Sequence, residues 1–365
     1  MRGEKDKQEL MLTTVSPETV VPQGHPIRKI KALVDEQLAG LDSVFEKMYS
    51  HEGRPSIPPE RLVKALLLMA LYSLRSERQL CEQIGYNLLF RYFLDMNLAE
   101  EPFAPTVFTK NRDRFLEFEL GAKFFQGVVK EARAEGLLSE EHFSVDGTLI
   151  EAWASMKSFR PKDKGQGGGS VGGGSGNDPV DFHGETRSNM THQSVTDPEA
   201  RLLRKGRGKE AKLCFALHAV TENRHGLIVD TKFTRSVGTT ESIESVAAIR
   251  RLRQRGFYPK TVGADKGYHN RTFVQGLRKL NVIPHAVPMS NRHIDGLDER
   301  TFRHKSFLKS QRKRKLIEQC FGWFKTVAGY RKTRYRGVAT NQLISQFLAS
   351  AYNLVRMTKL MPMVA

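Results

Sequence analysis

Cysteine is scarce in this chain of 365 residues, which contains three of them at wide spacing, Cys81, Cys214 and Cys320. An odd and scattered set argues against a disulfide framework and against a cysteine zinc site, and it favours the reducing cytosol. A long apolar run is also missing, because the longest one, at residues 65–74, is far short of the ~20 residues that span a bilayer. The amino-terminal residues have no apolar core and are not expected to be a secretory signal. We therefore expect a cytoplasmic protein that does not enter a membrane.

Acidic side chains are outnumbered, with 40 Asp and Glu against 58 Lys and Arg, which gives a net charge of +18. Such a balance implies attraction to polyanions, nucleic acid or an acidic membrane surface, without choosing between them. The shortage of acids is most marked in residues 300–336, where thirteen Lys or Arg accompany a single acid, Glu318. A solvated helix normally mixes both signs, so this stretch indicates a surface prepared for an anion with one acid placed in it.

The first third of the chain has the apolar spacing of helices. Residues 1–25 are polar and are expected to form a flexible tail, whereas residues 26–138 predict an all-helical module. Ser76 and Gln79 form a capping box at the start of one helix. The two helices joined at Arg75-Ser76 could be a base-reading helix-turn-helix or an ordinary packed pair, and the sequence leaves both open.

From His142 onward the pattern changes to short strands alternating with helices. A β-like run over residues 142–145 ends in Asp146-Gly147, and a Gly-rich insertion follows at about 155–205, with eight glycines in residues 165–176 that indicate a flexible loop. Further strands are expected at 213–220, 227–234, 261–264 and 282–287, the first two as a hairpin, with helices at 240–256, 272–280, around Glu318 and at 341–360. This order predicts an α/β sheet over residues 139–338, with Asp146 and Asp265 at the ends of neighbouring strands, and a C-terminal helix in residues 339–365 that packs on it.

The acidic motifs differ in how much they say alone. Asp146-Gly147 and Asp265-Lys266-Gly267-Tyr268 each follow a strand, where such a sequence is most often a simple turn. The helix around Glu318 says more, because its polar residues share one stripe, Gln311, Arg314, Glu318 and Lys325. The opposite arc is expected to face the core and consists of Leu316, Ile317, Cys320, Phe324 and Val327. Glu318 could belong to a solvated, salt-bridged face or to an anion-binding surface, and its basic surroundings favour the second.

Taken together, the segments 142–153, 263–268 and 312–336 resemble the DDE transposases of bacterial insertion sequences, in the group typified by insertion sequence five. The run from Ile317 to Lys325, followed by residues 329–337, is close to that group's usual text, and residues 77–80 resemble its N-terminal domain. The resemblance implies an α/β, RNase-H-like catalytic domain, a mixed sheet with flanking helices, preceded by an all-helical domain for DNA binding or assembly. It also implies dependence on two Mg²⁺ or Mn²⁺ ions, and DNA cleavage followed by strand transfer at the element ends.

The resemblance assigns roles to individual residues. Asp146, Asp265 and Glu318 would be the catalytic carboxylates that hold the two ions. Arg314 and Lys325 match the family's spacing around the glutamate and would hold DNA phosphate, whereas Gln311 stands where the related signature has tyrosine. Further DNA contacts are expected from Lys266, Tyr268, Arg331, Lys332, Arg334 and Arg336, although Tyr268 could instead pack against the sheet.

The expected partners are double-stranded DNA, as terminal inverted repeats and target, and a second copy of the chain when DNA is bound. Recognition of the repeats is expected in the helical module. Trp323 is expected to pack in the core, and Trp153 could either pack or stack on a base.

Three other functions compete with this interpretation. A non-catalytic DNA-binding relative would be expected to have lost a carboxylate, and all three are present. A nuclease that cuts without joining is opposed by the long helical module. A basic nucleoid component is opposed by the single acid inside the basic stretch, because that class predicts evenly spread charge.

Overall fold

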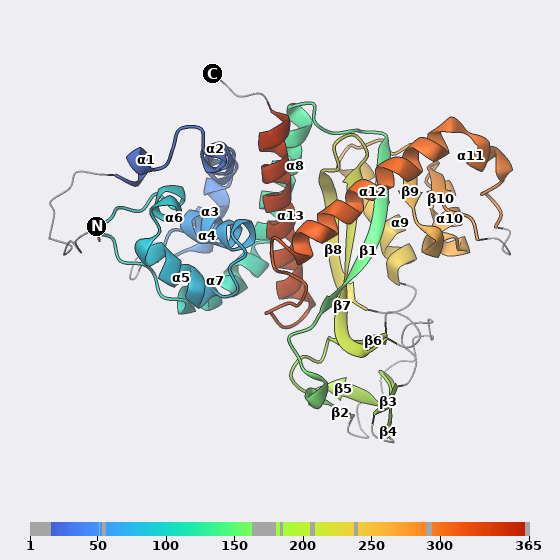
Figure 1. Cartoon of the computed structure of the whole chain (residues 1–365), viewed down its shortest axis with the longest axis horizontal. Helices are drawn as coiled ribbons and strands as arrows, with labels where there is room; N and C mark the ends of the chain where they lie inside the picture. Colours follow the sequence, from blue (N-terminus) through green and yellow to red (C-terminus); the bar gives the residue numbers. More distant parts are fainter. Residues whose placement is uncertain are drawn as a thin grey trace, which may run out of the picture.

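The computed structural model describes residues 16–50, 52, 56–162, 180–182, 185–204, 209–236, 240–289 and 294–361. A helical half comes first and a mixed α/β half follows (Figure 1). The helices of the first half are α1 Pro17–Val20, α2 Pro26–Ala39, α3 Asp42–Met48, α4 Pro59–Leu71, α5 Glu77–Tyr86, α6 Leu88–Phe93, α7 Thr106–Glu117 and α8 Leu120–Ala134. Within the described ranges, no helix combines the length and the apolar character that crossing a bilayer requires.

Local side-chain chemistry sets the ends of these helices. The Ser76 hydroxyl accepts a hydrogen bond from the Gln79 N–H at 3.0 Å, and the Gln79 side chain accepts from the Arg75 N–H at 3.0 Å, as a capping box requires. The expectation of a flexible tail through residue 25 is wrong for its last part. Ser16 caps the short helix α1, and Arg28 donates to the carbonyl of Val21 at 2.8 Å. Residues 1–15 lie outside the described part of the chain.

The sheet is built around one long strand, β1 (His142–Glu151). It pairs antiparallel with β7 (Ala211–Glu222) and parallel with β9 (Thr261–Ala264), while β8 (Ile228–Arg235) pairs with β7 and β10 (Ile283–Ala286) with β9. The β7–β8 pair is the predicted hairpin. Three antiparallel strands followed by two short parallel ones, joined by crossover helices, form the mixed sheet of an RNase-H-like fold, as predicted.

Helices cover both faces of this sheet (Figure 1). They are α9 Thr240–Gln254, α10 Arg271–Arg278, α11 Glu299–Arg303, α12 Lys305–Lys325 and α13 Val338–Leu360. Side chains alternate between the faces of a strand. A Cβ atom at Gly263, which pairs with Ser144, would meet Ser310 of α12, whereas a Cβ atom at Gly147 would meet Glu241 of α9. Because residues 144 and 147 have opposite parity, α12 and α9 lie on opposite faces of β1.

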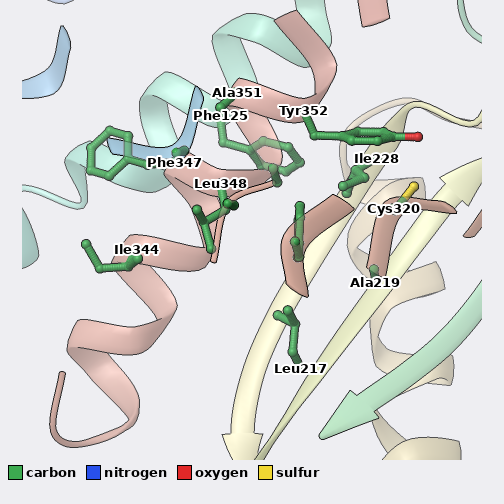
Figure 2. Close-up of a cluster of buried hydrophobic side chains, with 14 of the residues drawn as sticks. Phe125, Leu217, Ala219, Ile228, Cys320, Ile344, Phe347, Leu348, Ala351 and Tyr352 are labelled. Carbon is green, nitrogen blue, oxygen red and sulfur yellow. The ribbon is translucent and has the colours of Figure 1, made fainter. Parts of the chain in front are cut away.

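Helix α13 packs between the helical half and the sheet. Figure 2 shows Phe347, Leu348 and Tyr352 of this helix between Phe125 of α8 and Ile228 of β8. Contact with α8 is close enough that a Cβ atom at Gly121 would lie 2.7 Å from a methyl carbon of Leu343. On the other side, the Asn353 amide bonds both the N–H and the carbonyl of Ile228 at 2.8 Å, which covers the outer edge of the sheet.

The insertion after β1 contains more order than its composition indicates. Its described strands are β2 Phe159–Pro161 paired with β5 His192–Ser194, β3 Val180–Phe182 paired with β4 Glu185–Arg187, and β6 Arg201–Arg204 paired with β7. The prediction of a loop through residue 205 is therefore wrong for these segments. Isolated apolar residues explain the order, since Phe159 and Leu202 are buried at 2% and 1% exposure. The glycine run at 165–176 lies outside the described residues.

Candidate functional site

Asp146 and Asp265 come from two adjacent parallel strands. Ser144 pairs with Gly263, so each aspartate lies two residues beyond this pair on its own strand. The expectation that Asp146 ends its strand is wrong, because β1 continues to Glu151. The neighbouring strand β9 instead ends at Ala264. The end of β9 leaves the flank of β1 open beside Asp146, and Asp265 turns into that opening.

The segment after β9 is the tight turn that its sequence predicts. The Asp265 carboxylate accepts a hydrogen bond from the Gly267 N–H at 2.8 Å and caps a single 3-10 turn over Lys266–Tyr268. Lys266 is exposed. Tyr268 is 1% exposed and packs edge-on against Phe273, with ring centroids 5.1 Å apart. Tyr268 therefore packs in the core and has no surface through which to contact DNA, which corrects its inclusion among the DNA-binding residues.

Asp146 carries an unusual proton affinity. Burial raises the pKa of its carboxyl to about 7, and the negative charges of Asp265 and Glu241 act in the same direction. The Gly147 N–H, which donates to Asp146 Oδ1 at 2.8 Å, and the charge of Arg314 oppose this shift. Within the described residues, neither aspartate forms an ion pair. The two carboxylates thus repel each other in a partly dehydrated site.

Glu241 is a third acid at this place and was not predicted. It is the second residue of α9, and its Oε1 atom lies 3.1 Å from where a Cβ atom on Gly147 would be. Although its side chain reaches the surface, burial raises the pKa of the Glu241 carboxyl, and the charge of Asp265 raises it further. An acid in the first turn of a helix is ordinarily a partner of the helix dipole, so the sequence offers no signal that singles it out.

Gln311 fixes α12 relative to the ends of the parallel strands. Its side-chain amide donates to the carbonyl of Ala264 at 3.3 Å and to the carbonyl of His285. The helix also lies very close to β9, because a Cβ atom at Gly263 would be 2.8 Å from Ser310 Oγ. The residue immediately after Ala264 is Asp265, so the glutamine that replaces the signature's tyrosine positions one of the acids.

Arg314 and Glu318 pair with each other on the polar stripe of α12. Their side chains are 3.3 Å apart and are 18% and 58% exposed, respectively. Arg314 is also close enough to Asp146 that its charge lowers the pKa of that carboxyl. Glu318 does not join the aspartates directly: among the described residues, no group of three His, Cys, Asp or Glu side chains is arranged to hold a metal ion. The structure thus brings Asp146 and Asp265 together and leaves Glu318 one helical turn beyond Arg314.

The rest of α12 is arranged largely as expected. Lys325 donates to the hydroxyl of Thr148 on β1, which places the end of the stripe against the same strand as Asp146. Ile317, Cys320 and Phe324 are buried, as predicted. Val327 is 38% exposed, because the helix ends at Lys325 and Val327 leaves the arc. Its predicted core position is wrong.

The basic segment after α12 runs beside the far end of β1. The Glu151 N–H donates to the carbonyl of Arg331 at 3.1 Å, and the Thr333 N–H donates to the carbonyl of Glu151 at 2.8 Å. Arg331, Lys332 and Arg336 are exposed. Arg334 is half-buried and donates to the carbonyl of Leu74 at 2.7 Å, so it links this segment to the helical half.

The two tryptophans differ in burial. Trp323 is partly buried and packs edge-on against Tyr352, with ring centroids 5.7 Å apart. Trp153 is 50% exposed, on the segment that follows β1.

The donor set is chemically suited to a hard divalent cation. Asp146, Asp265 and Glu241 offer carboxylate oxygens, which Mg²⁺ and Mn²⁺ prefer over nitrogen or sulfur. Mutual repulsion raises the pKa of the first of them, and a bound dication would remove that repulsion. Glu318 is exposed on a neighbouring helix and can approach by side-chain rotation.

Two family models match the sequence. Residues 15–114 match a transposase domain (DUF772), and residues 182–354 match a transposase DDE domain. The second match includes Asp265 and Glu318, and Asp146 precedes it. No curated protein matches the chain.

Solved structures of Mos1 complexes have weak similarity to the chain. A pre-cleavage Mos1 transpososome is 12% identical, with 85% of this chain and 82% of that one covered and a TM-score of 0.20. The Mos1 strand transfer complex is 13% identical, with 79% and 82% covered and a TM-score of 0.21. A Mos1 mariner paired-end complex with Mn is 13% identical, with 79% and 83% covered and a TM-score of 0.21. Similarity this low does not bear on how the chain folds or acts.

Proposed function

We propose, on the premise that this chain belongs to the DDE transposases, that it cleaves DNA at the ends of an insertion sequence and joins the freed 3′-OH to target DNA. The group typified by insertion sequence five is the one whose text the chain resembles. The observation that carries the proposal is the position of Asp146 beside Asp265, at the open flank of β1, with the stripe of α12 crossing the same strand.

The proposed catalytic residues are Asp146, Asp265 and Glu318, whose carboxylates would hold two Mg²⁺ or Mn²⁺ ions. When bound, such a pair of ions supplies activation of the attacking oxygen and stabilisation of the leaving oxygen in phosphodiester transfer. The chain's own contribution is to aim the carboxylates. Asp146 is fixed by the Gly147 N–H, Asp265 by the Gly267 N–H, and α12 by Gln311.

Arg314 would have two partners in turn. In the DNA-free chain it pairs with Glu318 and lowers the pKa of Asp146. A DNA phosphate competes well for a guanidinium, because two parallel charge-assisted hydrogen bonds fit its geometry. Arg314 would then turn to the phosphate and release Glu318 toward the aspartates. DNA binding and assembly of the third carboxylate would be coupled through one side chain.

DNA affinity would come from the basic surface. Lys266, Arg331, Lys332 and Arg336 are exposed, and Lys325 lies against β1. Contacts of this kind are insensitive to sequence and weaken with salt. We assign recognition of the terminal inverted repeats to the helical part, residues 26–138, and expect at least a dimer when two DNA ends are paired. The expected location is the cytoplasm, on the nucleoid.

Cleavage of a DNA fragment carrying the element's terminal repeats tests the proposal. The wild type is compared with Asp265→Asn in Mg²⁺ and in EDTA, with Asp113→Asn, an exposed change on α7, as the matched control. Cleavage and joining by the wild type and the control, with loss of both in Asp265→Asn and in EDTA, support the assignment. Equal cutting by wild type and Asp265→Asn would end it, and cutting without joining would favour a nuclease.

A further inference from the structure

We propose that Glu241 is a fourth carboxylate of this site, which joins Asp146 and Asp265 in holding one divalent ion while Glu318 serves the other. The inference rests on the proposed function, because it concerns the ions that the reaction uses. Nothing in the DDE pattern of three acids points to this residue, and the fold places it there.

The two faces of β1 carry different acids. Asp146 has the parity of Ser144 and points to the face that carries α12, the helix of Glu318. The next residue, Gly147, points to the opposite face, where the carboxylate of Glu241 covers it. Any larger side chain at position 147 would displace that carboxylate. Acids therefore approach the open flank of β1 from both faces, Glu318 by way of α12 and Glu241 by way of α9.

Charge supports the same grouping. Asp265 raises the pKa of Glu241, and both raise the pKa of Asp146, so the three carboxylates lie within electrostatic reach of one another. No ion pair of Glu241 occurs among the described residues. Glu318 by contrast has its own cation, Arg314. A cluster of three acids without a counterion is unfavourable unless a cation binds there.

A buried hydroxyl gives an independent sign that the site takes a ligand. Tyr268 is 1% exposed, and within the described residues its hydroxyl has no hydrogen-bond partner of normal geometry, although the Ser245 side chain lies near it. The carboxylates of Glu241, Asp146 and Asp265 all act on this group and raise its pKa. An unsatisfied buried donor costs about 1–3 kcal/mol. Rearrangement of the carboxylates around an ion would give this hydroxyl an acceptor.

A simpler role for Glu241 is favourable interaction with the amino-terminal end of α9. The two roles predict opposite behaviour without metal. As a dipole partner, Glu241 stabilises the chain in EDTA, so its removal lowers the melting temperature. As a member of an uncompensated acidic cluster, it repels its neighbours, so its removal leaves the melting temperature unchanged or raises it.

Mn²⁺ binding to the full chain decides between them. Free Mn²⁺ is titrated by its paramagnetic resonance signal against the wild type, Glu241→Gln, Glu318→Gln and the control Asp113→Asn. We expect Glu241→Gln to weaken binding of one ion by about tenfold or more, as loss of a supporting carboxylate does. Glu318→Gln is expected to weaken the other, and the double variant both.

Unchanged Mn²⁺ binding by Glu241→Gln overturns the inference. If that variant does not fold, Glu241→Asp and Gly147→Ala replace it, and wild-type Mn²⁺ binding by both is the overturning result. Failure of the inference is distinct from failure of the proposed function. In the first case Asp265→Asn still abolishes cleavage, and in the second it does not.

Discussion

Replacement of Asp146 by asparagine should stabilise the metal-free chain while abolishing its activity. The pKa of Asp146 is about 7 in the folded chain and 3.8 in an ordinary aspartate, so the folded state binds the proton more tightly than the unfolded state. Stability is therefore lost as pH rises from about 3.8 to about 7, and the penalty is fully present above that range. Asparagine keeps the acceptor for the Gly147 N–H but cannot ionise, so it removes the penalty.

The size of the effect depends on the shift. A difference of about three pKa units corresponds to a ceiling of roughly 4 kcal/mol at about 1.4 kcal/mol per unit. Asp265 and Glu241 share the titration, so the observed gain should be nearer to about 2 kcal/mol at pH 8. At pH 5 less than half of it should remain, because wild-type Asp146 is then mostly protonated.

Urea denaturation in EDTA at pH 5 and pH 8 measures this gain. Asp230→Asn is the matched control, since Asp230 is buried between Arg251 and Arg255 and its neutralisation should destabilise the chain by a few kcal/mol. Addition of Mg²⁺ should stabilise the wild type more than Asp146→Asn, because binding to the folded state adds stability. An Asp146→Asn variant no more stable than wild type at pH 8, or equally stabilised at both pH values, would refute this account of the carboxyl.

Three further predictions concern the surroundings of the site. Gly263→Ala should destabilise the chain by about 1–3 kcal/mol through overlap with Ser310 Oγ, and Ser310→Ala should restore part of it in thermal denaturation; no recovery would contradict the close packing of α12 on β9. Gln311→Ala should cost about 1–3 kcal/mol and slow DNA cleavage, because two buried carbonyls lose their donor, whereas Gln319→Ala, exposed on the same helix, should match wild type in both assays. Neutralising Arg331, Lys332 and Arg336 should lower the slope of log affinity against log salt by about 0.9 for each DNA phosphate that these side chains neutralise, with little change in melting temperature; an unchanged slope would remove this segment from the DNA surface.

The elements of the sheet and the acids on its strands were largely readable, and their surroundings were not. Apolar runs and turn residues predicted β7, β8, β9 and α12, and with them Asp265 and Glu318. The sequence could not tell where β1 ends, because strand pairing with β7 carries it well past Asp146. Similarly, the shortness of β9, which opens the flank of β1, depends on tertiary packing around its end and not on its own residues.

Glu241 and the order in the insertion were missed for a different reason. Glu241 reaches the site only because α9 returns across the face opposite α12, and a helix-start acid carries no mark of that. In the insertion, single apolar residues such as Phe159 and Leu202 find partners far along the chain, and a polar, glycine-rich composition conceals them.

The position of α13 bears on how such a protein can be divided or recombined. One side of this helix seats Gly121 and Phe124 of α8, and the other seats the edge of the sheet. A fragment lacking the helical half would present Leu343 and Phe347 to water, and a fragment lacking α13 would leave α8 uncovered. Exchange of the helical half between relatives, to redirect it to new DNA ends, must therefore be accompanied by matching changes at the opposite end of the chain.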